Sequence, residues 1–252
     1  MSSDSTPTRK DAPPTPAGRR SDNAAIDAFV RQARALATPK GAGEGGGRLI
    51  LALDATMSRQ PTWDLACRLQ GEMFDAVGKA GGKTGGLSVQ LVYFRGFGEC
   101  CASRFVRDTA ALKDLMTRID CRGGHTQIGK VLAHALKETG RRKVDALVYI
   151  GDAMEEAVDD LAEKAGRLGL RGVPVFVFQE GHDPVAETAL REIARLSKGA
   201  WFRFDGNAAD TLAKLLSAVA VFASGGLKAL EARDRPEDRL MIEHLRKAGG
   251  RG

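Results

Sequence analysis

Short apolar stretches alternate with longer amphipathic ones along residues 48 to 223, and this alternation limits the possible folds more than any other feature. Apolar runs bounded by glycine or polar residues predict strands, and apolar residues spaced three and four apart predict helices. Strands alternating with helices of this length favour a mostly parallel sheet covered on both faces. The predicted strands are RLILALD, LSVQLVYFRG, CCASRFV, VDALVYIGDA, VPVFVFQEG and AWFRFD, centred near residues 50, 91, 103, 148, 176 and 202.

The rest of the chain divides into flanking segments. Residues 1–20 are rich in Ser, Thr, Pro and charge, which predicts a disordered tail because such a segment buries little apolar surface. Residues 21–47 are predicted to hold a helix and a glycine-rich linker. The main domain is predicted to cover residues 48–223, followed by a helical extension over residues 224–252. We expect both flanking helices to dock away from the site described below.

Composition and charge exclude several classes of function. The net charge of +6 permits binding to nucleic acid, but no interleaving of aromatic and basic residues supports it, so nucleic acid is not an expected partner. The four cysteines form no CxxC pair, as expected of reduced thiols. There is no apolar signal core near the start, and the uncharged run at 215–227 is too short to span a bilayer. We therefore expect a cytoplasmic protein without a membrane partner.

Oxygen-bearing side chains follow two predicted strands and lie in one loop between them. Asp54, Thr56 and Ser58 stand at alternate positions in LALDATMSRQ, Thr126 follows two glycines in CRGGHTQIGK, and Asp152 ends LVYIGDA. Ligands of an open parallel sheet bind at the carboxyl ends of its strands, so we expect these side chains to meet at one edge. The all-oxygen set suits Mg²⁺, Mn²⁺ or Ca²⁺ rather than zinc. Few formal charges surround the ion, which leaves one position for an outside carboxylate.

These three elements together resemble the metal-ion-dependent adhesion site of von Willebrand factor A domains. DATMS resembles the family's DxSxS element, GGHTQIGKVLAHAL its Gly-Gly…Thr loop and following helix, and LVYIGDA its strand that ends in aspartate. The order of the elements also matches, and the resemblance covers residues 48–222. It implies a Rossmann-like α/β/α fold with a mostly parallel six-stranded sheet and one antiparallel edge strand.

The resemblance also implies roles for the five side chains. Asp54, Thr56 and Ser58 would hold the metal, and Thr126 would ligate it in the ligand-bound state. Asp152 would act directly or through water. The implied function is metal-dependent protein–protein interaction, as an adaptor in a cytoplasmic complex rather than as an enzyme. The partner would offer an Asp or Glu to the metal, and complexes built on AAA+ ring-shaped ATPases are among those that such domains serve.

The sequence departs from the family pattern at several positions. Thr56 stands where serine is more usual, and its hydroxyl can serve as well. Gly151 and Ala153 flank the last aspartate where threonine and glycine are common, and alanine takes a positive φ less readily than glycine. Glu155 and Glu156 follow directly, either as extra acidic ligands or as a cap of the next helix.

Other interpretations stay open at this point. Asp54 alone fits a strand-end turn, Ser58 the N-cap of a helix from about residue 60, and Thr126 the N-cap of its own helix. Asp-x-Thr after a strand also resembles phosphotransferases of the haloacid dehalogenase type, but Thr56 stands where those enzymes need a second aspartate. The alternatives are thus a metal-dependent phosphotransferase or hydrolase, and a degenerate A domain that binds no metal.

Overall fold

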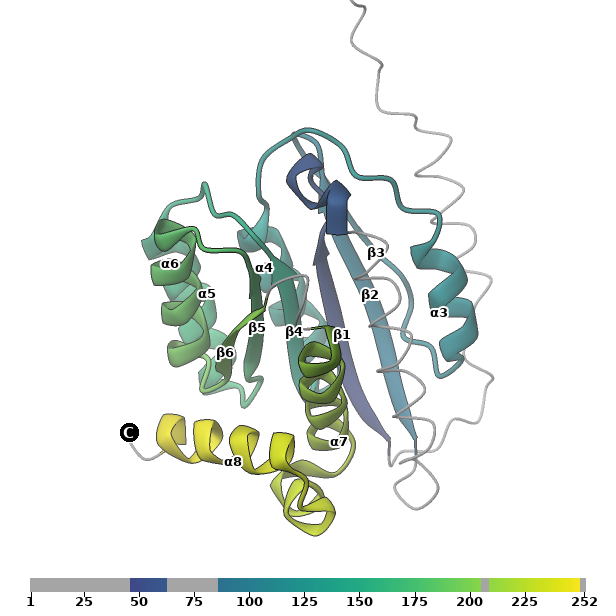
Figure 1. The fold of residues 1–252 in the computed structure, drawn as a ribbon, viewed down its shortest axis with the longest axis vertical. Coiled ribbons are helices and arrows are strands. Elements are labelled where there is room, and N and C mark those ends of the chain that lie inside the picture. The colour runs from purple at the N-terminus through teal and green to yellow at the C-terminus, as the bar shows by residue number, and fades with distance from the viewer. Residues whose placement is uncertain (1–45, 63–85, 205–208, 250–252) are drawn as a thin grey trace, which may run out of the picture.

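A computed structural model describes residues 46–62, 86–204 and 209–249 of the protein. The predicted tail and most of the helix and linker predicted over residues 21–47 lie outside these residues. So does WDLACRLQGEMFDAVGKA, whose apolar periodicity predicts a helix. The described parts include a six-stranded sheet with strand order β3-β2-β1-β4-β5-β6 (Figure 1).

The predicted α/β class and sheet are confirmed. Only β3 runs antiparallel, to β2, and the other neighbouring strands pair in parallel. The third strand ends earlier than predicted, because Ser103 turns its hydroxyl onto the backbone N–H of Leu91 and only an isolated bridge joins Val106 to Val89. The strands are β1 (Gly47–Asp54), β2 (Leu87–Arg95), β3 (Glu99–Ala102), β4 (Ala146–Gly151), β5 (Val175–Glu180) and β6 (Ala200–Phe204).

Helices cover both faces of the sheet and make three layers (Figure 1). One face packs against α4, α5 and α6, and the other packs against α3, α7 and α8. The helices are α3 (Thr109–Met116), α4 (Ile128–Arg141), α5 (Val158–Leu170), α6 (Pro184–Leu196), α7 (Ala209–Arg233) and α8 (Pro236–Gly249), with a 3-10 helix, η1 (Met57–Thr62).

Burial on both faces explains the near-continuous apolar runs of the central strands. In β1, Leu49, Leu51 and Leu53 point into the core beneath α3 and α7, while Ile50 and Ala52 point into the core beneath α4 and α5. A sheet covered on one face only would have polar residues at every second position. The alternation of side chains then carries Asp54, the last residue of β1, onto the same face as Ala52.

The long helix α7 continues past residue 223, where the sequence analysis placed the end of the main domain. It changes direction at Gly226, whose φ of 67° is accessible to glycine at little cost. After Asp234 and Arg235 the chain enters α8, which packs on α7 and β6 and places Met241 in the core. The segment Ala213–Arg233 is long and apolar enough to cross a membrane, but half of its most apolar 18-residue stretch is buried inside the protein.

Candidate metal site

The carboxyl ends of β1 and β4 lie side by side and bring two of the predicted acidic residues together. The strands pair in parallel with Leu53 opposite Ile150, so Asp54 and Gly151 follow at the next step. Beyond Asp54 the chain stays at this edge, because Thr56 forms an isolated parallel bridge with Arg122. The loop that leads to Thr126 is thereby joined to the first predicted metal loop.

The turn between β2 and β3 holds the Thr126 loop in place. The backbone N–H of His125 donates to the Gly96 carbonyl at 3.2 Å, and the Gln127 amide donates to the carbonyls of Arg95 and Gly96 at 3.1 and 3.3 Å. Gly124 is needed for this contact, since a Cβ there would lie 2.1 Å from the Gly96 carbonyl oxygen. Gly124, the second glycine of the predicted metal loop, thus allows the two loops to pack backbone against backbone, whereas a Cβ at Gly123 would meet nothing within 4 Å.

Buried oxygens without partners mark the centre of this edge. Asp54 is fully buried, and its Oδ1 accepts a hydrogen bond from the Thr56 N–H at 2.8 Å. Asp54 Oδ2 and Asp152 Oδ1 are buried and have no hydrogen-bond partner among the described residues. The Thr56 and Ser58 hydroxyls lie 3.1 Å apart. Four of the five predicted ligands therefore bring oxygen atoms to adjoining positions.

Thr126, the fifth predicted ligand, is bonded to the loop after β4. Its N–H donates to Glu155 Oε2 at 2.9 Å, and its Oγ1 accepts from the Glu155 N–H at 3.0 Å. The alternative role of Thr126 as N-cap of α4 is not observed, because the N-cap residue is Gln127, whose own side chain makes no cap hydrogen bond. His125 Nδ1 lies 3.1 Å from the same Glu155 carboxylate.

Of the two glutamates after Asp152, Glu156 caps a helix, but not the next one, which was one of the two roles expected from the sequence. The Glu156 carboxylate accepts hydrogen bonds from the N–H groups of Ile128 and Gly129, at 2.5 and 2.8 Å, at the start of α4. The next helix, α5, begins after Ala157 without a side-chain cap. The sequence-based interpretation was wrong here because the free N–H groups of α4 lie across the edge from Glu156, a juxtaposition that only the sheet creates.

A buried arginine that was not identified from the sequence also lies at this edge. Arg59 in η1 is only 1% exposed, forms an ion pair with Glu180 at the end of β5 and lies 5.9 Å from the Phe204 ring centroid. Burial lowers the pKa of Arg59, while the charges of Asp152 and Asp54 oppose that shift. The arginine follows the DATMS element directly, and nothing in the local pattern distinguishes it from an exposed residue.

The electrostatics of the edge favour a bound cation. Burial raises the pKa of Asp54 to about 6; the Asp152 charge adds to the shift, whereas Thr56 and Arg59 oppose it. Because Arg59 is also paired with Glu180, it does not neutralise both aspartates. Within the described ranges, no cluster of three or more His, Cys, Asp or Glu residues could hold a metal. A cation here would therefore depend on hydroxyl ligands.

Comparison with known proteins identifies the fold. No protein-family model matches the sequence, and neither does any curated protein. Among solved structures, the SpRpn10 VWA domain matches with a TM-score of 0.56 at 12% identity, over 67% of this chain and 94% of that one. The chain has the fold of a von Willebrand factor A domain.

Two further similar structures contain a metal. Proximal thread matrix protein 1 from the mussel byssus, with zinc in its MIDAS motif, is 18% identical with a TM-score of 0.52, over 70% of this chain and 45% of that one. The manganese-loaded TRAP protein of Plasmodium vivax is 16% identical with a TM-score of 0.52, over 69% and 74%. Zinc in the first of these means that an oxygen-rich A-domain site does not by itself exclude that metal.

The residues at this edge of the A-domain fold suit a divalent cation. Two buried carboxylate oxygens have no partner among the described residues, and two hydroxyls lie within hydrogen-bond distance of each other. The charge of Asp152 adds to the rise in the pKa of Asp54 that burial causes. Oxygen ligands of this kind are those that hard divalent ions prefer. Asp54, Thr56 and Ser58 would hold the ion with Asp152, and the ion would supply an electrophilic centre for an outside carboxylate.

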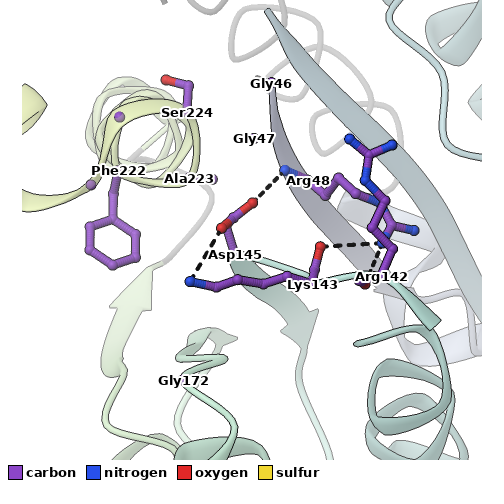
Figure 2. Close-up of a pocket in the computed structure, with 12 residues that line it drawn as sticks. Gly46, Gly47, Arg48, Arg142, Lys143, Asp145, Gly172, Phe222, Ala223 and Ser224 are labelled. Carbon is purple, nitrogen blue, oxygen red and sulfur yellow. Dashed lines mark hydrogen bonds and ion pairs between the residues drawn. The ribbon is translucent and has the colours of Figure 1, made fainter. Parts of the chain in front are cut away.

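A second polar cluster lies at the opposite edge of the sheet, where β1 and β4 begin (Figure 2). A pocket of about 410 Å³ opens there between the start of β1, the end of α4 and the kink of α7. The Arg48 N–H donates to Asp145 Oδ2 at 2.8 Å, and Lys143 Nζ lies 3.8 Å from Asp145 Oδ1. The residues predicted as metal ligands lie at the other edge.

Proposed function

We propose that the protein binds a divalent cation, Mg²⁺ or Mn²⁺, through Asp54, Thr56, Ser58 and Asp152, and that the bound ion joins it to a protein partner. The observation that carries this proposal is the pair of buried carboxylate oxygens, of Asp54 and Asp152, that have no partner in the described part of the chain. Asp54 is hydrogen-bonded to Thr56, whose hydroxyl lies 3.1 Å from that of Ser58. An acidic side chain of the partner would complete the coordination, with Thr126 joining in the complex. Zinc in the MIDAS motif of one similar structure and manganese in another support divalent metal binding in general.

Exposed apolar side chains beside the site support a protein partner. Phe97, in the turn between β2 and β3, is 83% exposed and packs edge-on against His125 with ring centroids 5.2 Å apart. Met57, between two of the proposed ligands, is 55% exposed. Aromatic residues and methionine are enriched in protein interfaces relative to the rest of the surface. The protein would act as an adaptor in a cytoplasmic complex, with complexes that contain AAA+ ATPases as the first candidates.

Calorimetry tests the metal site directly. Mg²⁺ and Mn²⁺ are titrated into the wild type, Asp54→Asn and a control, Asp159→Asn, whose carboxylate is exposed in the first turn of α5. The wild type and Asp159→Asn are expected to bind the ion equally. Asp54→Asn is expected to lose binding because it removes a charge without changing the shape of the side chain. Equal binding by Asp54→Asn would contradict the proposal.

Partner capture tests the second half of the proposal. Immobilised wild type, Thr126→Ala and Thr126→Ser are incubated with lysate in Mg²⁺ or in EDTA, and the retained proteins are compared. Serine keeps the hydroxyl that Glu155 N–H now bonds, so Thr126→Ser controls for loss of the methyl group. Retention should require Mg²⁺ and a hydroxyl at position 126. Retention that is unchanged in EDTA would show that the ion does not join the two proteins.

One observation favours a second candidate, an A-domain scaffold that binds partners without metal. The Arg59 guanidinium lies near Asp54 and Asp152 and partly offsets their charge. On this alternative, wild-type protein would show no heat of binding with either ion, and partners would be retained equally in EDTA and in Mg²⁺.

A further inference from the structure

Tyr149 lies beneath the proposed metal site and is not one of the proposed ligands. It stands in β4 opposite Ala52 of β1, two residues before the end of each strand, and is 2% exposed. Its ring stacks on that of Phe94 in β2, with centroids 6.2 Å apart and planes 6° apart. Its position on the strand places it on the face of the sheet that carries Asp54.

The phenol reaches up toward the end of its strand because Gly151 leaves room for it. A Cβ at position 151 would lie 2.4 Å from the Tyr149 hydroxyl and 2.8 Å from Cζ. Threonine, the residue common at this position in the family, could not be accommodated beside the ring as it lies. Gly151, a departure from the family pattern, and the buried tyrosine are therefore two parts of one arrangement.

At this position the Tyr149 hydroxyl has no hydrogen-bond partner in the described part of the chain. It is buried and makes no hydrogen bond to any described residue. The acidic groups whose charges act on it most are Asp54 and Asp152, the two that also carry buried oxygens without partners. An unbonded buried hydroxyl destabilises a folded protein, so its presence here needs a reason.

We propose that the Tyr149 hydroxyl is a positioning donor for the metal site, and that it donates a hydrogen bond to the Asp54 or Asp152 carboxylate when that carboxylate holds the ion. This inference rests on the proposed metal site and adds a residue to it. Donors that orient metal-ligating carboxylates commonly contribute tenfold or more to metal affinity. Gly151 is part of the same arrangement, because only a residue without a side chain leaves room for the Tyr149 hydroxyl.

Tyr149→Phe separates this role from an ordinary packing role. Phenylalanine keeps the ring on Phe94, so the variant should fold. Two results are expected. Affinity for Mn²⁺ and Mg²⁺ in calorimetry should fall about tenfold. The melting temperature in EDTA should rise by about 2–4 °C, because the variant no longer buries an unbonded hydroxyl.

Tyr93 provides a matched control, since it is the other tyrosine of the two in the sequence. It lies in β2 on the opposite face of the sheet, and its hydroxyl donates to Glu99 Oε1 at 3.1 Å. Tyr93→Phe should lower the melting temperature in EDTA and leave metal affinity unchanged. The same change of one oxygen atom would then have opposite effects on stability at the two positions.

The possible outcomes distinguish the inference from the proposed function. Equal affinity in the wild type and Tyr149→Phe would overturn the inference and leave the metal site standing. A lower melting temperature of Tyr149→Phe in EDTA would also overturn it, because the hydroxyl would then be bonded without the ion. Absence of binding by the wild type would overturn the proposed function and this inference together.

Discussion

The two edges of the sheet bury charged groups in different ways. At the amino edge, Arg48 is 8% exposed, its guanidinium donates to the Arg142 and Lys143 carbonyls, and it lies 3.8 Å above the Phe105 ring centroid. At the carboxyl edge, buried oxygens of Asp54 and Tyr149 have no partner in the described residues. Both clusters join the ends of β1 and β4, so topology does not cause the difference.

This difference in hydrogen bonding indicates a different role for each edge. A buried polar group that has all its partners joins segments of the chain and needs nothing from outside. A group left without partners destabilises the fold, which is tolerated where a ligand supplies the missing contact. The amino edge therefore has the bonding of a structural joint, and the unbonded oxygens of the carboxyl edge are what the proposed metal site would require. Stability measurements on single variants test this contrast.

Arg48→Met should have the largest effect. Methionine keeps much of the apolar stem, but the Arg142 and Lys143 carbonyls lose their donor, and so does Glu138. Glu138 keeps its other ion pair, with Arg141, but the two carbonyls lose a charged donor, so the free energy of unfolding should fall by about 3 kcal/mol. Urea unfolding measures it. The exposed Arg118→Met is the control, and a loss as small as the control's would refute a structural role for this edge.

Gly151→Ala should have the next largest effect, at the other edge. Its Cβ would overlap the Tyr149 hydroxyl and ring, and overpacking of this kind costs about 1–3 kcal/mol. In the Tyr149→Phe background the cost should be smaller, because one of the overlapping atoms is gone. A double-mutant cycle by urea unfolding measures the coupling. Additive effects of the two changes would mean that the contact does not determine the conformation of this edge.

Asp54→Asn should stabilise the protein when no ion is present. The buried carboxylate has one oxygen without a partner, so replacing the charge with a neutral amide of the same shape should raise the free energy of unfolding by about 1 kcal/mol. Unfolding in EDTA at neutral pH measures this gain. In Mg²⁺ the order should reverse, since only the wild type gains binding energy. A clear loss of stability in EDTA would place Asp54 with the structural groups.

Lys143→Met should have the smallest effect on stability. It compares an exposed charge of the amino-edge cluster with the buried charge of Arg48. Lys143 belongs to the amino-edge cluster, but its side chain is 70% exposed and lies 3.8 Å from Asp145. Solvent screens such a pair, so the free energy of unfolding should change by less than about 0.5 kcal/mol. A loss comparable to that of Arg48→Met would show that charge alone, rather than burial with bonded partners, stabilises this edge.

The sequence by itself determined the fold, and it predicted at which edge of the sheet the oxygens of the proposed metal ligands lie. Doubly buried strands such as β1 carry apolar residues on both faces, and this pattern with the alternation of strands and helices predicted a mostly parallel sheet. The antiparallel edge strand was expected from the family resemblance. Because parallel strands end at one edge, Asp54 and Asp152 could be assigned to the same region before the structure was known. The start of α6 also follows local rules, because Pro184 stands in its first turn directly after Asp183, whose side chain caps the helix.

Tertiary structure alone decided which groups are bonded and which are left without partners. Glu156 caps α4 rather than the next helix because the sheet brings two distant segments together. Arg59 is buried because η1 lies over the end of β5, which no local pattern reveals. The space that Gly151 leaves for Tyr149 depends on the packing of the ring. Periodicity in a sequence reports which face of an element is buried, whereas hydrogen-bond satisfaction depends on atoms from segments far apart in the chain.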